Sequence, residues 1–562
     1  MAALDMTGER SSSTSGPSLN RRQFLIGSAA GIGALALTRC APSVRSSGAT
    51  VRLPDGALGF PSPFAANADL GYNQMSLLYD TLLWKDGSGQ LLPWLAESHE
   101  SSPDHIRHTF TLRDGLRWSD NRPLTADDVV FTFDYYAKQG TLSPPVIIQP
   151  PQGIAKVSAT GARTVEVVLD APYVTFPEQV AAALPIVPKH IWSSIDDPAG
   201  AQDRKILVGS GAYRLESYNG DGGALLYTAR SDYFLGAPFV SRIEENPADD
   251  PIGPLLAGAT DVARGVGLRA DTLAPFQNQA FGVLAEQGSS TAALYWNMGK
   301  EGPLSDVRFR RAWAMAIDRA DLVARLAAGR GRPGNPGFLG PENPFLTPVP
   351  PYPFDVAGAN ALLDGAGYRR RGGEDIRRTG AGNPLSVELL IENTRAPLAE
   401  ILVAALRQIG VELRPKQVEL GPQLFGNKFV GAYDVAALPF PGPGPGGPNA
   451  DPDVLRLLFS SRVPPSLQAA TNYVNNKFDD LADRQRLAFD QTERMNLVAQ
   501  MQRMLADDLP ILALYYPETE LLYRRQVLDQ WYITPGQFPS AYDNKQLFIT
   551  GQKTGTAIRP HR

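Results

Sequence analysis

The sequence contains one cysteine, Cys40, and five histidines among its 562 residues. A single thiol cannot form an internal disulfide, and it cannot supply the cysteine pairs of structural metal sites. His-Glu-x-x-His, Gly-x-Ser-x-Gly and P-loop patterns are also missing from the sequence. The sequence therefore offers little for metal-dependent, serine-hydrolase or nucleotide chemistry.

Charge and long apolar runs are also limited. Only 20% of the residues are charged, 43% are hydrophobic, and the formal net charge is −5. After residue 40 no apolar run approaches the roughly 20 residues of a transmembrane helix. The composition allows a large core divided into two or three lobes, and it excludes nucleic acid and anionic membrane surfaces as partners.

The N-terminus carries the pattern of an export signal. Arg21 and Arg22 precede an apolar, Gly/Ala-rich run over 24–37 that is too short to span a bilayer. This is typical of a twin-arginine (Tat) signal, so we predict that 1–39 is removed and that 40–50 is a tether. The alternative is a buried helix that happens to follow two arginines. Without 1–39 the chain keeps 49 basic and 56 acidic residues, a net charge of about −7.

Cys40 lies directly after this segment. Leu37-Thr38-Arg39-Cys40 resembles a lipobox, in which the cysteine is lipidated, although the residue before that cysteine is normally small. Cleavage after Ala36 is the alternative, and it would leave the thiol unmodified. Lipidation and cleavage therefore both remain open from the sequence.

The stretch 106–136 has the clearest local pattern in the chain. Apolar residues alternate over 106–113, which predicts a half-buried strand, and Asp114-Gly115 predicts a turn. Thr125 and Asp128 have the spacing of a capping box, which predicts that a helix follows. In this strand His108 points away from the side of Arg107.

The segment LRDGLRWSDNRPLTADDVVFTF over 112–133 closely resembles the signature of bacterial extracellular solute-binding proteins of family 5, the peptide, nickel and opine group. Asn121 stands where that family usually has glycine, and asparagine also tolerates left-handed turn geometry. Further similar segments lie at 78–82, 93–98, 208–215, 303–319 and 357–368. The glycines of 208–215 lack the spacing of a phosphate cradle.

The resemblance implies a mixed α/β, bilobal fold of the periplasmic binding protein type II class, cluster C, with an extra domain. It implies a discontinuous lobe I, an additional domain on the side of lobe I, and a lobe II. The expected bounds are 51–75, 205–290 and 520–550 for lobe I, 76–204 for the additional domain, and 291–519 for lobe II.

The later sequence predicts further elements. A strand at 385–391, a helix at 400–410 and a strand at 411–414 suggest a βαβ unit in a parallel sheet. A helix is expected to include Met75, Leu78, Leu82 and Leu83. In the helical stretch 303–319, Arg308, Arg311 and Arg319 are expected to face mostly outward, and 369–382 is expected to be an exposed basic excursion.

The resemblance implies a non-enzymatic, extracytoplasmic protein of an ABC importer that captures a small organic solute, such as a peptide, and delivers it to the permease. We expect a monomer without cofactors or metal, attached to the membrane only through a possible lipid. A binding site needs apolar walls and a few polar groups. Candidate ligand contacts are Tyr72 and Asn73 in a first loop, Tyr295, Trp296 and Asn297, and Phe440 and Asp451 on either side of a Pro/Gly tract.

Peptide binders of the family commonly pair an aspartate in the loop before the Asp-Pro motif with the peptide's α-amino group. Here 440–450 contains no carboxylate, so a peptide ammonium would have to reach Asp451 or another acid. Opine, oligosaccharide and nickel-chelate binding remain alternatives, and His99, His105 and His108 are conceivable metal ligands whose spacing does not force them together. Other classes are an exported hydrolase with paired carboxylates and an adhesion or chaperone module.

Overall fold

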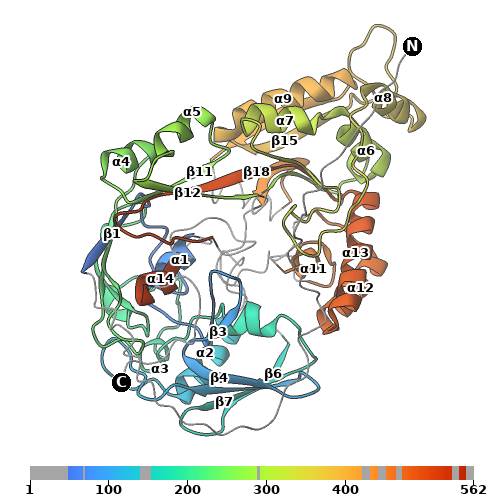
Figure 1. Ribbon diagram of the computed structural model, residues 1–562. Helices are drawn as coiled ribbons and strands as arrows, with labels where there is room; N and C mark the ends of the chain where they lie inside the picture. Colours follow the sequence, from blue (N-terminus) through green and yellow to red (C-terminus); the bar gives the residue numbers. More distant parts are fainter. Residues whose placement is uncertain are drawn as a thin grey trace, which may run out of the picture. The chain divides into compact units, whose positions relative to one another are not determined.

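The computed structural model describes residues 48–66, 70–139, 153–287, 291–419, 431–440, 451–463, 471–533 and 544–551 (Figure 1). The strands in these ranges form four sheets. None of the helices in these ranges combines the length and apolar character that a membrane span requires.

The first sheet joins the start of the described chain to a later segment. Its order is β1-β10-β9-β8, with β1 parallel to β10 and the other pairs antiparallel. The strands are β1 (Ala49–Leu53), β8 (Tyr213–Tyr218), β9 (Leu225–Ala229) and β10 (Val240–Glu245).

The second sheet contains the strand predicted over 106–113, just before the family-like signature. Its antiparallel order is β4-β5-β7-β6. The strands are β4 (Ala96–Ser101), β5 (Arg107–Leu112), β6 (Ile154–Ala159) and β7 (Thr164–Leu169). In β5, His108, Phe110 and Leu112 are buried while Arg107 is exposed, which confirms the predicted alternation.

The turn and helix after β5 are also confirmed. Asn121 adopts a positive φ of 71°. The backbone N–H of Thr125 donates to Asp128 Oδ2 at 3.0 Å, which is one half of a capping box, and α2 (Ala126–Gln139) follows. The hydroxyl of Thr125 lies 3.4 Å from the same carboxylate oxygen, where a helical amide was the expected partner.

The largest sheet has the order β11-β18-β13-β17-β15-β16, and β12 and β14 also pair with β18. β18 therefore lies between β11 and β13, and it forms the long red strand of Figure 1. The strands are β11 (Val262–Val266), β12 (Phe281–Gln287), β13 (Thr291–Trp296), β14 (Gly331–Pro333), β15 (Ser386–Glu392), β16 (Glu412–Val418), β17 (Val435–Phe440) and β18 (Ile511–Arg524).

The predicted βαβ unit is confirmed in this sheet. β15 and β16 run parallel, with Ser386 opposite Glu412, and α9 (Ala396–Gln408) connects them. Leucines and alanines of α9 share a core with the buried side chains of β15. The opposite face of the sheet shares a second core with α11 (Val454–Phe459), α12 (Asn476–Leu487) and α13 (Gln491–Asp508).

The remaining elements are short connections and covering helices. They are α1 (Leu70–Ser76), β2 (Leu83–Lys85), β3 (Leu91–Pro93), η1 (Pro177–Ala181), α3 (Lys189–Trp192), η2 (Arg204–Ile206), α4 (Ile252–Ala257), α5 (Ala270–Leu273), η3 (Ala274–Phe276), η4 (Pro303–Ser305), α6 (Val307–Ala316), α7 (Arg319–Leu326), α8 (Val356–Gly365), η5 (Asn393–Arg395) and α14 (Lys545–Thr550).

The prediction of a helix that reaches Leu83 is wrong, because α1 ends at Ser76. Beyond Ser76, backbone groups form hydrogen bonds with residues that are distant in the sequence. The N–H of Asp80 donates to the Ser210 hydroxyl at 2.9 Å, and the carbonyl of Asp80 accepts from the N–H of Ile186. Leu83 begins β2 instead.

The expectation for the arginines was right for Arg308 and Arg311 and wrong for Arg319. The Arg319 side chain is buried and donates to the carbonyls of Gly334 and Tyr352. Likewise, Arg377 is buried within the excursion that was expected to be exposed, and it donates to the carbonyl of Ile409 at 2.8 Å. In both cases the guanidinium satisfies backbone carbonyls that would otherwise be buried without donors.

Two family-like segments meet backbone to backbone. The N–H of Gly211 donates to the carbonyl of Leu78 at 2.8 Å. An added Cβ at Gly209 would lie 1.9 Å from that same carbonyl oxygen, so only glycine fits. The buried Arg230 donates to the carbonyls of Gly211 and Trp118, which joins this contact to the signature segment.

A fully buried ion pair lies beside this contact. Lys545 Nζ in α14 is 2.7 Å from Asp80 Oδ1, and both side chains are completely inaccessible to solvent. Asp80 also accepts from the indole N–H of Trp94 at 2.9 Å and from the Tyr233 hydroxyl at 3.2 Å. The pair therefore ties α14 to the segment that follows α1.

Candidate functional site

The carboxyl ends of the parallel strands define one edge of the largest sheet. β15 and β17 run parallel, with Ile391 opposite Ala437. β13 runs antiparallel to β17 and begins at this edge, where Thr291 lies opposite Phe440. Since open α/β sheets bind ligands outside the carboxyl ends of their strands, this edge is the candidate site.

An ion pair lies at the end of β15. Arg395 Nε is 3.3 Å from Glu392 Oε2, and the two side chains keep 29% and 11% of their accessible surface. Tyr515 lies nearby on β18, opposite Ala292, and burial raises the pKa of its hydroxyl while the charge of Arg395 acts to lower it. The Glu392–Arg395 ion pair is therefore partly accessible to solvent, whereas Tyr515 beside it is buried.

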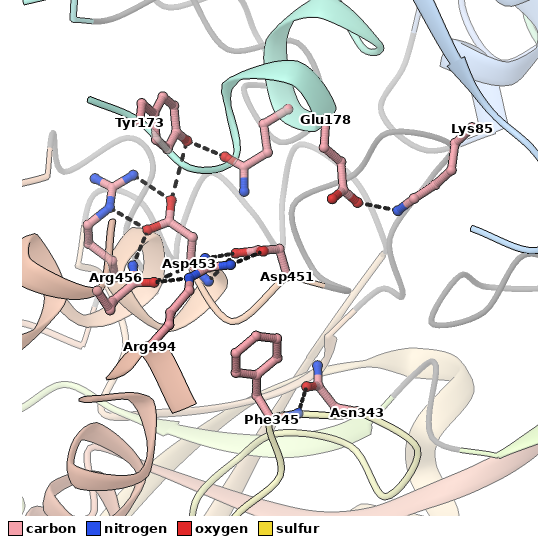
Figure 2. A network of polar contacts seen from close by, with 11 residues as sticks. Lys85, Tyr173, Glu178, Asn343, Phe345, Asp451, Asp453, Arg456 and Arg494 are labelled. Atoms are coloured by element: carbon pink, nitrogen blue, oxygen red, sulfur yellow. Dashed lines mark hydrogen bonds and ion pairs between the residues drawn. The ribbon is translucent and has the colours of Figure 1, made fainter. Parts of the chain in front are cut away.

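Asp451 begins the next described range after β17. Arg494 of α13 donates two hydrogen bonds to its carboxylate, of 2.7 Å to Oδ2 and 2.5 Å to Oδ1 (Figure 2). Both side chains are buried, with 9% and 8% of their surface exposed. The guanidinium also lies over the ring of Phe345, with 5.4 Å from Cζ to the ring centroid.

Asp453 continues this network. Arg456 binds its two carboxylate oxygens at 2.7 Å each, and Gln485 donates to Oδ1 (Figure 2). Gln485 also accepts from Arg494, which links the two ion pairs. On the other side the Tyr173 hydroxyl is 3.4 Å from Asp453 Oδ2.

The two aspartates have different electrostatic surroundings. Burial raises the pKa of Asp451 to about 6, although the hydrogen bonds and charge of Arg494 act to lower it. Burial also acts to raise the pKa of Asp453, but the charge and hydrogen bonds of Arg456, with help from Arg494 and Gln485, hold it below the usual 3.8. The network thus contains one carboxylate with a raised pKa and one with a lowered pKa.

The raised pKa of Asp451 predicts a specific pH dependence of stability. An acid with a folded-state pKa above its unfolded value of about 3.9 stabilises the fold below pH 4, and this contribution is lost as pH rises through 6. A rise to about 6 corresponds to about 3 kcal/mol. The free energy of unfolding, measured with urea, should therefore fall by about this amount between pH 4 and 7 relative to Asp451→Asn. A constant difference between the two proteins would contradict the assignment.

Three of the candidate residues lie at the other end of β13. Trp296 is opposite Val435, five positions from the pair of Thr291 with Phe440, or roughly 17 Å along the strand. Trp296 packs on Trp313, and the amide of Asn297 donates to the carbonyls of Gly431 and Tyr433. Tyr295, Trp296 and Asn297 are all buried, and the structure does not bring them to Asp451.

Tyr72 and Asn73 lie on α1 and not in the expected loop. Both are buried, and the Tyr72 hydroxyl donates to the carbonyl of Ala183 at 2.8 Å. Phe440 ends β17 at the candidate edge, and only its backbone is described. Cys40, the export signal and the tract 441–450 lie outside the described residues.

Sequence reasoning missed the arginines of the site. Arg494 lies in the first turn of α13, where a positive charge opposes the helix dipole. A cation at such a position is mildly unfavourable, which is a weak sequence signal for a nearby acid. Arg395 follows a predicted strand end, which was also recognisable.

The histidines form a pair instead of a three-ligand site. His99 Nε2 is 3.0 Å from His108 Nδ1, whereas the His105 ring stacks on Phe489. Burial, with the charges of the other two histidines adding to it, lowers the pKa of His108 to about 4. Among the described residues, no group of three or more His, Cys, Asp or Glu side chains is placed to hold a metal ion.

Comparisons with known proteins match this architecture. The dipeptide-binding protein of Escherichia coli (strain K12) is 25% identical over 476 residues, which cover 80% of this chain and 85% of that protein. The nickel-binding periplasmic protein of the same organism is 28% identical over 362 residues, 61% of this chain and 66% of that protein.

Solved structures show the same fold. The oligopeptide-binding protein AppA from Bacillus subtilis, in complex with a nonapeptide, superposes with a TM-score of 0.74 at 21% identity over 88% of this chain and 98% of that one. NikZ from Campylobacter jejuni, in complex with Ni(L-His), superposes with a TM-score of 0.73 at 21% identity, and the match covers 90% of this chain and 99% of that one. These likenesses confirm the predicted mixed α/β, bilobal fold class.

The sequence profile described as "Bacterial extracellular solute-binding proteins, family 5 Middle" matches residues 90–462, about two thirds of the chain. This range includes the signature over 112–133, Glu392, Arg395 and Asp451. The chain belongs to family 5 of the bacterial extracellular solute-binding proteins.

Proposed function

We propose that this protein is the solute-binding component of an ABC importer and that it captures a small peptide or peptide-like solute between two lobes for delivery to the permease. The division into lobe I, additional domain and lobe II given above is part of this proposal. Support comes from family membership and from relatives whose names specify dipeptides and oligopeptides. The observation that carries the proposal is the edge of the largest sheet, where Glu392 and Arg395 remain partly accessible.

A binding role fits the chemistry of the acidic residues better than a hydrolytic role. Each aspartate of the network is held by an arginine, Asp451 by Arg494 and Asp453 by Arg456. A carboxylate fixed in this way is poorly placed to exchange protons with a substrate. The peptide-like class is placed first because dipeptide-, oligopeptide- and di/tripeptide-binding proteins are among the relatives of this chain, and a nickel chelate is the alternative that ligand screening distinguishes.

Ligand screening tests the proposal. Peptides of different lengths, opines, oligosaccharides and nickel chelates would be compared by thermal shift and intrinsic fluorescence. A ligand at 100 times its Kd should add about 2.7 kcal/mol to the free energy of unfolding. No shift with any ligand, or turnover of one of them, would overturn the proposal.

The candidate edge has its own test. We expect Arg395→Gln to weaken binding of the solute found in the screen at least about tenfold, because hydrogen bonds to charged groups contribute roughly 1.5–3 kcal/mol. Arg407→Gln is the matched control, since Arg407 lies on α9, is exposed and pairs with Asp375 away from this edge. Equal Kd values for wild type and Arg395→Gln in calorimetry would place the site elsewhere.

We further propose that the protein is exported as a monomer and attached to the membrane through lipid on Cys40. Fractionation of cells that express wild type and Cys40→Ser tests the attachment. The serine variant should move from the membrane to the soluble fraction. Release of both forms would instead support cleavage after Ala36.

A further inference from the structure

The carboxylate of Asp451 is closed to a ligand. Both of its oxygens accept hydrogen bonds from Arg494, and Oδ1 also accepts from the backbone N–H of Asp453 at 2.8 Å. Only 9% of the side chain is exposed. A ligand ammonium that used this carboxylate would have to displace Arg494.

Displacing Arg494 would leave a buried guanidinium without its counter-ion. Apart from Asp451, Arg494 donates to the side-chain amide oxygen of Gln485 and lies over the Phe345 ring, and neither group carries a negative charge. The nearby Asp453 is already held by both hydrogen bonds of Arg456. A buried charge without a partner is strongly disfavoured. The ion pair therefore acts against any solute that brings its own cation to Asp451.

Three further acids near the network and the sheet edge are also paired. Asp453 is bound by Arg456, Glu392 by Arg395, and Glu178 by Lys85 (Figure 2 shows the first and the third of these pairs). In the sequence, the tract 441–450 that precedes Asp451 contains no Asp or Glu. Together with Asp451, four carboxylates of the described chain around the network and the sheet edge are thus already neutralised by neighbouring cations.

We propose that the solute is a peptide-like compound without a free ammonium group, such as an N-acylated or N-terminally cyclised peptide, and that Arg494 determines this preference by occupying Asp451. This inference rests on the proposed function and narrows it. A neutral N-acyl group needs no counter-ion, so it can lie beside the closed pair without disturbing it.

Matched peptide pairs test the preference in the wild-type protein. Each peptide, two to five residues long, would be titrated at pH 7 in its free-amine and N-acetylated forms by calorimetry. We expect the acetylated form to bind at least about tenfold more tightly. Equal affinity, or tighter binding of the free amine, overturns the inference and leaves the peptide-binding function intact. Failure of every pair in both forms overturns the peptide-like class itself.

A variant provides a second readout. Arg494→Gln leaves Asp451 without its guanidinium, so a ligand ammonium can take that place and stabilise the ionised carboxylate, and the affinity ratio of free-amine to acetylated peptide should rise at least about tenfold. Arg503→Gln, at an exposed position of the same helix, should leave the ratio unchanged. If Arg494→Gln fails to fold, Asp451→Asn with Arg494→Gln removes both charges and should keep the wild-type preference. A free-amine preference in this double variant overturns the inference.

Discussion

Replacing Lys545 by methionine is expected to lower the free energy of unfolding by about 3–5 kcal/mol. The change leaves Asp80 as a charge with no exposed surface and no cationic partner at its Oδ1. The Lys545 ammonium also donates to the carbonyl of Ser76 at 2.5 Å and lies 4.9 Å from the ring centroid of Trp84, and both contacts disappear. Urea unfolding followed by intrinsic fluorescence measures the loss.

Two controls distinguish the buried pair from a general effect of losing a lysine. Lys138→Met, at an exposed position of α2, should change stability by less than about 0.5 kcal/mol. Lys545→Met combined with Asp80→Asn removes the stranded charge and keeps an acceptor for Trp94, so it should recover part of the loss. A single Lys545→Met variant as stable as wild type would show that the pair is not formed.

The second large effect is expected for Gly209→Ala. The new methyl group would lie 1.9 Å from the carbonyl oxygen of Leu78 and 2.8 Å from the carbonyl carbon. These are backbone atoms, and the neighbouring hydrogen bond from Gly211 to Leu78 holds them in place. We expect a loss of about 3 kcal/mol or more, at the upper end of overpacking effects.

Gly365→Ala is the matched control because it is also a glycine-to-alanine change. Nothing lies within 4 Å of an added Cβ at Gly365, the last residue of α8. Alanine there should be neutral or stabilise by up to about 1 kcal/mol. Similar unfolding midpoints for Gly209→Ala and wild type would contradict the close backbone contact.

Local patterns explain why much of the fold could be predicted. The strand predicted over 106–113 and the turn at Asn121 depend on neighbours in the sequence, and the structure confirms both. The helix expected to reach Leu83 was wrong because Asp80 bonds to residues more than 100 positions away. Hydrogen-bond partners that are so far away in the sequence leave no local residue pattern from which they could be predicted.

The candidate site depended more on tertiary structure. All six residues of β13 are buried, so the strand shows no alternation that would tell which end faces a ligand. Asp451 was recognised as a candidate, but its partner Arg494 is 43 residues away. The sequence indicates which charges exist, and the tertiary structure determines which of them remain available to a ligand.

The central position of β18 constrains how the protein is made. Its neighbours β11 and β13 are complete by residue 296, yet the strand that joins them begins at Ile511. A nascent chain that has emerged only as far as residue 510 exposes two strand edges without the strand that fills them. Closing such long loops is slow, and unfilled edges invite association with other chains. The largest sheet can therefore form only near the end of synthesis, and we expect nascent chains to depend on chaperones until that point.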